Sequence, residues 1–260
     1  MKKIKVTAVS YLNTKPLLYG LLQDQLEKHI DLQLNIPSVC AEKLKSGAVD
    51  LGLVPVAIIP ELEQPYIISD YCIGTKGAVE TVCIYGDRPI EEMSHIYLDY
   101  HSRTSVELTK ILLRDHWQLS PELMKASQGY IDQIEGRVGG LVIGDRTIGL
   151  DKRFKYCYDL GEVWFQHTQL PFVFAAWISN KPLDPEFVQA FNRALAKGIE
   201  LIPQLRFIIP SPSPDFDLET YFTHHISYDL DAKKRQALAL FLDAIPSKLA
   251  ASEVPGLLYT

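Results

Sequence analysis

The sequence has 260 residues, 47% of them hydrophobic, which is enough to bury a substantial core in one large or two medium domains. Lys and Arg number 26 against 32 Asp and Glu, which gives a formal net charge of -6. Nucleic-acid binding is therefore disfavoured, because a surface that neutralises phosphates carries a basic excess. No run approaches the ~18–20 apolar residues of a membrane helix, so we expect no membrane partner.

The N-terminal segment MKKIKVTAVSYL could open a signal peptide, since lysines precede apolar residues. However, Lys5 breaks the apolar run, Lys15 and Pro16 end it, and no small-residue cleavage site follows. The four cysteines show no CxxC spacing and lie among apolar neighbours. This favours free buried thiols in a reducing compartment over a disulfide pair, so we expect a cytoplasmic protein.

Strand-like and helix-like segments alternate in the first part of the chain. Alternation or a short apolar run predicts strands at Ile4–Val9, Leu32–Ile36 and Asp50–Val54. Helices are expected between them, over Pro16–Gln25 and from Pro37 to Gly47, the second with Ser38 as its N-cap. The βαβαβ order predicts a parallel sheet.

A second α/β set follows two further strand-like runs. Strands are expected at Tyr66–Ile73, Val79–Tyr85, His95–Leu98, Gly139–Ile143 and Phe172–Ile178. Helices are expected at Thr104–Arg114, after the N-cap pair Asp184-Pro185, at Leu218–His225 and at Ala232–Leu242.

This order predicts an α/β fold of two lobes, each a mostly parallel sheet flanked by helices, with a ligand cleft between them. Lobe I is expected to take residues 1–84 and 172–260, including the C-terminal helices, and lobe II residues 85–171. Two strands, one near Cys83 and one at Phe172–Ile178, would cross between the lobes and form a hinge.

Polar residues follow the first strand in the segment SYLNTKPL, from Ser10 to Leu17. The carboxyl end of a parallel strand is where open α/β sheets bind ligands. Asn13 can both donate and accept hydrogen bonds, and the N–H groups near Thr14 can face an anion. A capping turn in which Asn13 and Thr14 satisfy backbone groups explains the segment equally well.

A second polar turn precedes the helix expected at Thr104–Arg114. Ser102, Arg103, Thr104 and Ser105 bring hydroxyls, free N–H groups and a guanidinium to its start. These groups suit a carboxylate, and we favour an anion site here. The alternative is an ordinary Ser or Thr N-cap with an Arg that faces solvent.

Two weaker candidates lie elsewhere. Thr81 precedes the first crossing strand and could reach the cleft, although its position alone favours an ordinary strand threonine. Asp145 ends the strand in GGLVIGDRTIG and could bind a ligand hydroxyl or transfer a proton, but we favour a cap of the next helix. The histidines show no HExxH or other paired spacing, so we expect no metal.

Six segments, in matching order, resemble chorismate dehydratase of the futalosine route to menaquinone. They are SYLNTKPLLYG, VDLGLVPVA, DYCIG, SRTSVEL, LVIGD and LPFVFAAW, within about residues 4–179. The resemblance implies a type II periplasmic-binding-protein-like fold. It also implies a lyase that removes water from chorismate to give 3-[(1-carboxyvinyl)oxy]benzoate, with no cofactor.

The resemblance also implies roles for residues. Asn13 and Thr81 are expected to be catalytic, with Thr81 where many relatives carry serine. Substrate binding is expected from Ser10, Tyr11, Ser102, Arg103, Thr104, Ser105 and Asp145. Because aromatisation drives the reaction, we expect orientation and electrostatic stabilisation to dominate, with the substrate's own carboxylate as proton acceptor.

Other interpretations remain open. A non-catalytic binding protein for a small carboxylated solute, cytosolic or exported, would use the same cleft. The later pathway enzyme that makes dihydroxynaphthoate typically begins with Ser-Pro-Cys-Pro-Asn-Asp, which is absent here. A ligand-sensing regulator would carry a helix-turn-helix, and none is evident. A monomer or a homodimer fits equally well.

Overall fold

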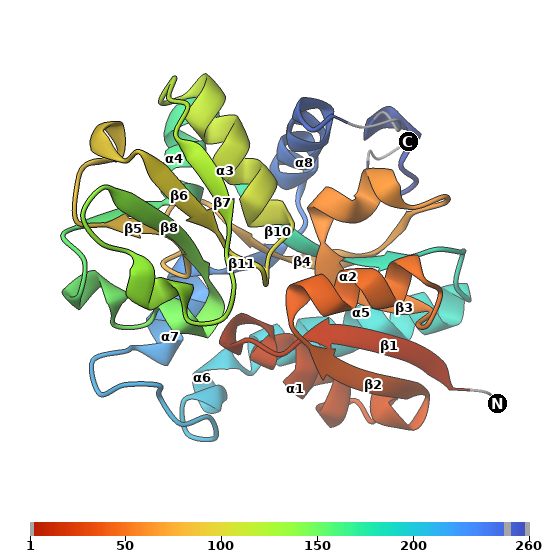
Figure 1. Ribbon diagram of the computed structural model, residues 1–260. Coiled ribbons are helices and arrows are strands. Elements are labelled where there is room, and N and C mark those ends of the chain that lie inside the picture. The colour runs from red at the N-terminus through yellow and green to blue at the C-terminus, as the bar shows by residue number, and fades with distance from the viewer. Residues whose placement is uncertain (1–2, 247–250, 258–260) are drawn as a thin grey trace.

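Two β-sheets organise the computed structural model, which describes residues 3–246 and 251–257 (Figure 1). Within these residues the first sheet has the strand order β11-β4-β10-β3-β1-β2 and the second β7-β6-β8-β5-β9. The first sheet contains β1 (Ile4–Val9), β2 (Ile30–Asn35), β3 (Leu51–Pro55), β4 (Tyr66–Thr75), β10 (Phe172–Ser179) and β11 (Ser227–Asp229). The second contains β5 (Val82–Gly86), β6 (His95–Leu98), β7 (Glu122–Lys125), β8 (Val138–Ile143) and β9 (Tyr156–Asp159).

The first three strands form the expected parallel unit, in which β1 pairs with β2 on one side and β3 on the other. Helices α1 (Lys15–Gln23) and α2 (Pro37–Lys45) connect them. The N-cap of α2 is Ile36 and no side chain caps it, so the expectation of Ser38 is wrong. Pro37 explains the shift, because proline suits the first helical position, where its missing N–H costs nothing.

The expected α/β fold of two lobes is present, but its sheets are mixed rather than mostly parallel. Strand β10 pairs antiparallel with both β3 and β4, and β5 pairs antiparallel with both β8 and β9. Strand β10 returns the chain to the first lobe, and β5 leads it into the second. Each therefore runs opposite to a strand of the parallel set in its own lobe, which is β3 for β10 and β8 for β5. The prediction missed this because it considered the order of elements and not the direction of the crossing strands.

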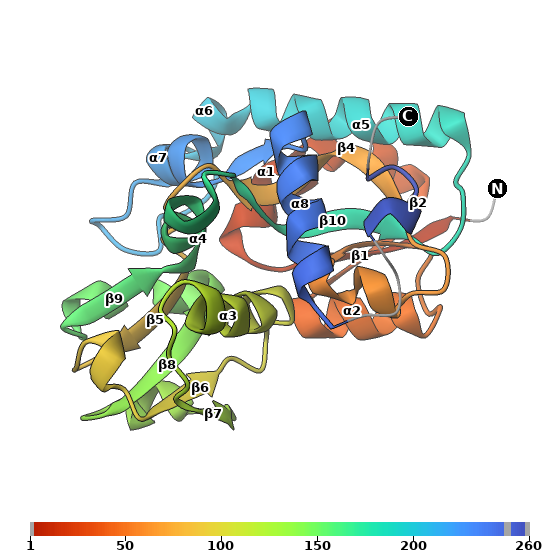
Figure 2. The same cartoon turned by 90° about the horizontal axis from the view of Figure 1, so that it is seen from above.

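The second sheet carries α3 (Thr104–Asp115) and α4 (Leu160–Thr168) on the side that faces the first lobe and α8 (Figure 2). Strand β6 pairs parallel with β7 and β8. The carboxyl ends of β6 and β8 therefore lie at one edge of this sheet, so the residues that follow them, Asp99 and Gly144, are brought near each other.

The C-terminal third packs on the first lobe. Helix α5 (Pro185–Glu200) begins as predicted, with the Asp184 carboxylate accepting hydrogen bonds from the N–H groups of Glu186 and Phe187 at 2.8 and 3.2 Å. Short α6 (Ile202–Leu205) follows, and α8 (Ala232–Ala244) lies beside β10 (Figures 1 and 2). The helix expected at Leu218–His225 is short α7 (Leu218–Thr220) continued by a π-helical turn (Tyr221–His225).

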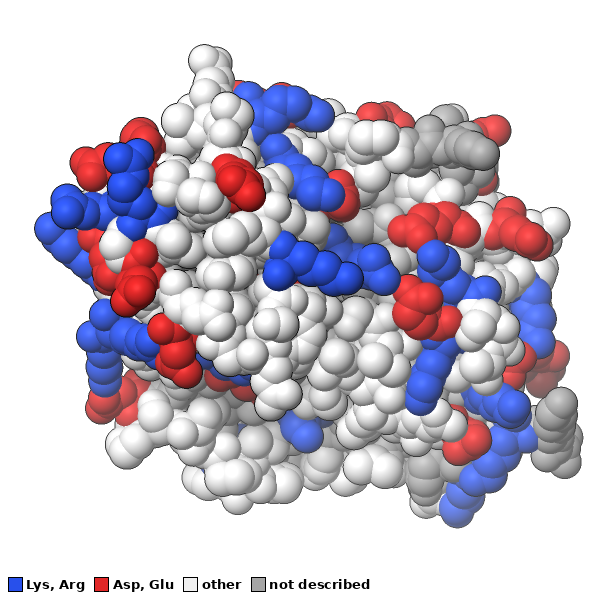
Figure 3. Space-filling model, viewed as in Figure 1, with Lys and Arg blue, Asp and Glu red and all other residues white. Residues whose placement is uncertain are grey.

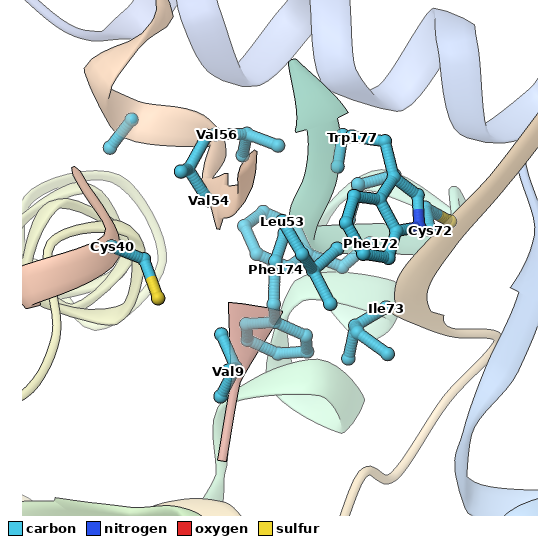
Figure 4. Packing of buried hydrophobic residues seen from close by; sticks show 14 of the residues in the cluster. Val9, Cys40, Leu53, Val54, Val56, Cys72, Ile73, Phe172, Phe174 and Trp177 are labelled. Carbon is cyan, nitrogen blue, oxygen red and sulfur yellow. The ribbon is translucent and has the colours of Figure 1, made fainter. Parts of the chain in front are cut away.

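One buried apolar cluster extends through both lobes. In the first sheet it includes Leu53, Phe172 and Trp177, which project from neighbouring strands (Figure 4). Phe172 contacts Phe241 of α8 at a ring-centroid distance of 5.0 Å. The returning strand β10 is therefore held by its neighbours β4 and β3 and by α8, which packs against it.

We propose that the chain passes from the first lobe to the second in residues 76–81 and returns in residues 169–171. Strands β4 and β10 belong to the first sheet, whereas β5 and β9 belong to the second.

All four cysteines are free and three of them are buried, whereas Cys157 is exposed and not buried as expected. Over the described residues, no helix is both long and apolar enough to cross a membrane.

Candidate functional site

A small cavity of about 50 Å³ lies between the lobes. None of the described residues that line it is charged. The first lobe contributes Val9, Tyr11, Asn13, Pro37, Pro55, Ile73, Phe174 and Ala175, the second contributes Val82, Ser102, Thr104, Ser105, Ile143 and Gly144, and Val79 and Thr81 come from the connection. The cavity is thus apolar with a few hydroxyl and amide groups, which is typical of a small-molecule site.

Asn13 lies in the turn that follows β1 and lines the cavity. Its backbone carbonyl accepts a hydrogen bond at 2.8 Å from the hydroxyl of Tyr228 in β11. Its side-chain oxygen accepts one at 3.2 Å from the Thr14 hydroxyl. The turn is therefore held from both sides, and the Asn13 amide is presented to the cavity in a fixed position.

Thr81 also lines the cavity and is buried. Its hydroxyl lies 2.9 Å from the hydroxyl of Tyr221, a residue of the π-helical turn. Burial raises the pKa of Tyr221, so its phenol stays protonated and can share its proton with Thr81. Nothing in the sequence pattern indicated Tyr221, because its segment has only an ordinary helical pattern.

The start of α3 opens at the cavity. Ser102 and Ser105 are both buried there, and the Ser105 N–H donates a hydrogen bond at 2.9 Å to the Ser102 hydroxyl oxygen. The 12-residue helix directs its N-terminal N–H groups, and the positive end of its dipole, toward this region. This feature suits an anionic group of a ligand without a charged side chain.

Thr104 lines the cavity but uses its hydroxyl for the fold. The hydroxyl donates to the Phe174 carbonyl at 2.9 Å and accepts from the Ala57 N–H at 3.2 Å. Both partners belong to the first lobe, so Thr104 fastens the start of α3 to it.

Arg103 and Ser10 lie away from the cavity. The Arg103 guanidinium donates to Glu42 at 2.9 Å in a surface ion pair, and its side chain is 51% exposed. It borders a broad outer groove of about 1520 Å³ along α2 and α3, on a face where acidic and basic side chains are intermixed (Figure 3). Ser10 is exposed, and its N–H donates to Asn35 in the parallel ladder.

Asp145 acts as a cap, although not of the helix next to it in the sequence. Its two carboxylate oxygens accept from the Leu12 N–H at 3.0 and 3.2 Å, at the start of the turn that carries Asn13. A side chain of the second lobe thus fixes a turn of the first.

Tyr11 leads to a polar cluster that the sequence did not indicate. Its hydroxyl lies 2.5 Å from Nδ1 of His101. Behind His101, the fully buried Asp99 accepts hydrogen bonds from the backbone N–H groups of His101 and Ile143, each at 2.9 Å, and is paired with Arg146 at 2.5 Å. The rule that places ligands at strand ends could have identified Asp99, which directly follows β6.

Comparisons with known proteins agree with this geometry. Residues 4–246 match a family model described as menaquinone biosynthesis. Chorismate dehydratase of Thermus thermophilus is 26% identical over 234 residues, covering 81% of this chain and 84% of that protein.

Solved structures are similar in fold. A protein from Archaeoglobus fulgidus has a TM-score of 0.73 at 16% identity, covering 93% of this chain and 96% of that one. The periplasmic aliphatic sulphonate binding protein of Escherichia coli has a TM-score of 0.58 at 15% identity, covering 97% of each chain. The expected periplasmic-binding-protein-like fold is therefore confirmed, and the chain belongs to the menaquinone biosynthesis family.

Proposed function

We propose that this chain is a cytoplasmic lyase that converts chorismate to 3-[(1-carboxyvinyl)oxy]benzoate and water without a cofactor. One observation carries the proposal, which is the uncharged cavity where Asn13, Thr81 and the start of α3 converge. The family match and the similarity to a chorismate dehydratase support the choice of substrate.

The start of α3 is suited to hold one of the two carboxylates of chorismate. Its N–H groups and the Ser102 and Ser105 hydroxyls offer donors, and the helix dipole favours negative charge there. An anchored carboxylate fixes the ring between the lobes, so the remaining groups act on a substrate that is already oriented.

The chemical step needs little from the protein. The ring carbon–oxygen bond breaks, the hydroxyl leaves as water, and a ring carbon loses a proton as the ring becomes aromatic. We propose that the substrate's own carboxylate accepts the ring proton and passes it to the leaving hydroxyl, which departs as water, since no charged side chain lines the cavity among the described residues. The linked hydroxyls of Thr81 and Tyr221 can donate to the leaving oxygen, and the Asn13 amide can orient the ring substituents.

Substrate entry requires the lobes to separate. A cavity of about 50 Å³ is far smaller than the ~300–1,000 Å³ of pockets that hold drug-sized ligands. Contacts that cross the cleft, such as that between Asp145 and Leu12, must therefore break and re-form in each cycle.

A direct test compares binding with consumption. The protein, treated with a chelator and desalted, is titrated with chorismate by calorimetry, and the mixture is then separated by liquid chromatography. Binding followed by conversion to an aromatic product agrees with the proposal. Saturable binding with all chorismate recovered would indicate the alternative, a binding protein for a small carboxylated solute.

A further inference from the structure

Tyr11 reaches from the first lobe into the second. It lies two residues after the end of β1, and its ring is nearly parallel to the His101 imidazole, with centroids 6.3 Å apart and an angle of 15°. Its hydroxyl lies 2.5 Å from the His101 Nδ1. Because Tyr11 also lines the cavity, this contact both joins the lobes and forms part of the cavity wall.

The second lobe has a space shaped for this ring. Gly144 has a φ of +66°, and a Cβ placed there would lie 2.5 Å from Cε2 of Tyr11. Gly149, five residues later, has a φ of +84°, but no heavy atom lies within 4 Å of its Cβ position. Glycine is therefore needed at position 144 for two reasons, which are the left-handed backbone conformation of this residue and the close approach of the Tyr11 ring.

Asp99 makes the receiving surface rigid. Its buried carboxylate accepts from the His101 N–H and the Ile143 N–H, which fixes the segments that carry His101 and Gly144. The same carboxylate pairs with Arg146, whose guanidinium lies 5.6 Å above the Tyr100 ring. The surface that receives Tyr11 is therefore fixed before the lobes meet, as a latch requires.

We propose that Tyr11 is a closure latch, whose ring seats on Gly144 and whose hydroxyl pairs with His101 when the second lobe closes on the first, and which keeps part of the protein closed before a ligand binds. In the closed form the Tyr11 hydroxyl is hydrogen-bonded to His101. Tyr11 therefore encloses the ligand with its ring, and other residues form the hydrogen bonds to the ligand. The latch rests on the proposed function in one respect only, which is the choice of chorismate as the probe.

The latch also gives closure a pH dependence. Burial, and then the nearby Arg146 guanidinium, lowers the pKa of His101, with the Asp99 carboxylate opposing them. Tyr11 and Tyr100 also face the imidazole, and burial raises the pKa of Tyr11, so its phenol stays neutral. Opening removes the burial that Tyr11 contributes but leaves Arg146 and Asp99 beside the imidazole, so the pKa of His101 is higher in the open form than in the closed form. Acid therefore protonates the open form first and disfavours closure.

The decisive experiment compares Gly144→Ala with Gly149→Ala, its matched control. Both add a methyl group at a left-handed glycine, but only the first meets Tyr11. Circular dichroism and thermal melting establish that each variant folds. Small-angle scattering without ligand is expected to show a larger radius of gyration for Gly144→Ala only. Its KM for chorismate is expected to rise at least tenfold, with kcat changed less than about threefold.

Tyr11→Phe is the gentler second variant, because it keeps the ring and removes one hydrogen bond. We expect its KM to rise about five- to tenfold, because this is the scale of one lost neutral hydrogen bond. The control variant Tyr19→Phe is expected to keep a KM within about twofold of the wild type. His101→Asn is expected to remove the rise of KM at acid pH, whereas His225→Asn keeps it.

Equal scattering and KM in the wild type and Gly144→Ala, or equal effects of the two glycine variants, would overturn the latch. A Tyr11→Phe variant with weaker chorismate binding but unchanged scattering would make Tyr11 a direct ligand contact instead. If chorismate is neither bound nor converted, the proposed function fails, but scattering of the two glycine variants still decides the latch.

Discussion

The Asp145 carboxylate and the Leu12 N–H, 133 residues apart in the sequence, meet at 3.0 Å across the cleft. This hydrogen bond joins the end of β8 to the turn that presents Asn13, so it links closure to the position of a proposed catalytic group. It also occupies a carboxylate that could otherwise act as a base, and it therefore bears on the mechanism.

Asp145→Asn tests whether this carboxylate takes the ring proton. The amide oxygen can still accept from the Leu12 N–H, so we expect kcat to stay within about threefold and KM to rise by less than tenfold, the scale of one weakened hydrogen bond. Steady-state kinetics and calorimetric titration with chorismate measure the two effects. Loss of turnover with intact binding would make Asp145 the base and contradict proton transfer to the substrate's carboxylate.

Thr81→Val removes the hydroxyl that faces the cavity while keeping the shape of the side chain. We expect kcat to fall about 10²-fold or more, the scale of a lost donor to a transition state. Thr81→Ser should recover most of it, and Tyr221→Phe should lose about tenfold, because Tyr221 holds that hydroxyl. Thr168→Val, at the end of α4, is the matched control. A Thr81→Val variant with wild-type kcat would remove Thr81 from the chemistry.

Arg103→Ala tests the anion site expected from the sequence against the surface ion pair seen in the structure. Since Arg103 is half exposed and paired with Glu42, we expect KM to change less than about threefold, in line with the small free energies of surface ion pairs. Ser105→Ala, at the cavity, should raise KM more. A larger effect of Arg103→Ala, retained in 0.5 M salt, would instead favour direct contact with a substrate carboxylate.

Lys234 provides a stability prediction. It is fully buried, and its Nζ donates to the Ser227 hydroxyl at 2.6 Å and the Asp229 carbonyl at 2.5 Å, which anchors β11 to α8. Lys234→Ala should lower the free energy of unfolding by about 2–4 kcal/mol, through the cavity and the unpaired acceptors. Chemical denaturation measures it against Lys233→Ala, on the exposed side of α8. Equal stability of the two variants would contradict the anchoring role.

The sequence predicted those elements whose own residues bury an apolar face. The expected strand His95–Leu98 is β6 itself, and Phe172–Ile178 is one residue short of β10. Strands β7, β9 and β11 were missed, since β7 and β9 are edge strands of the second sheet and β11 has three residues, and helix α4 was missed as well. Such strands form because a neighbour offers hydrogen bonds, which local periodicity does not record.

The candidate site shows the same division. The strand-end rule predicted a ligand site at Asn13, and Asn13 lines the cavity because β1 itself determines where its following turn lies. It could not show that Arg103 pairs with Glu42, that Asp145 caps Leu12, or that Tyr221 supports Thr81. Those partners are far apart in the sequence, and the contacts of Arg103 and Asp145 form only when the two lobes come together.

Proton NMR of chorismate mixed with the purified protein tests the dehydratase assignment without an intermediate step. The proposed reaction predicts new aromatic proton signals of 3-[(1-carboxyvinyl)oxy]benzoate as the chorismate ring signals disappear. It also predicts a rate at least about 100-fold lower in Asn13→Ala, through lost orientation and electrostatic stabilisation. Chorismate signals that broaden on binding but give no aromatic product would contradict the dehydratase assignment.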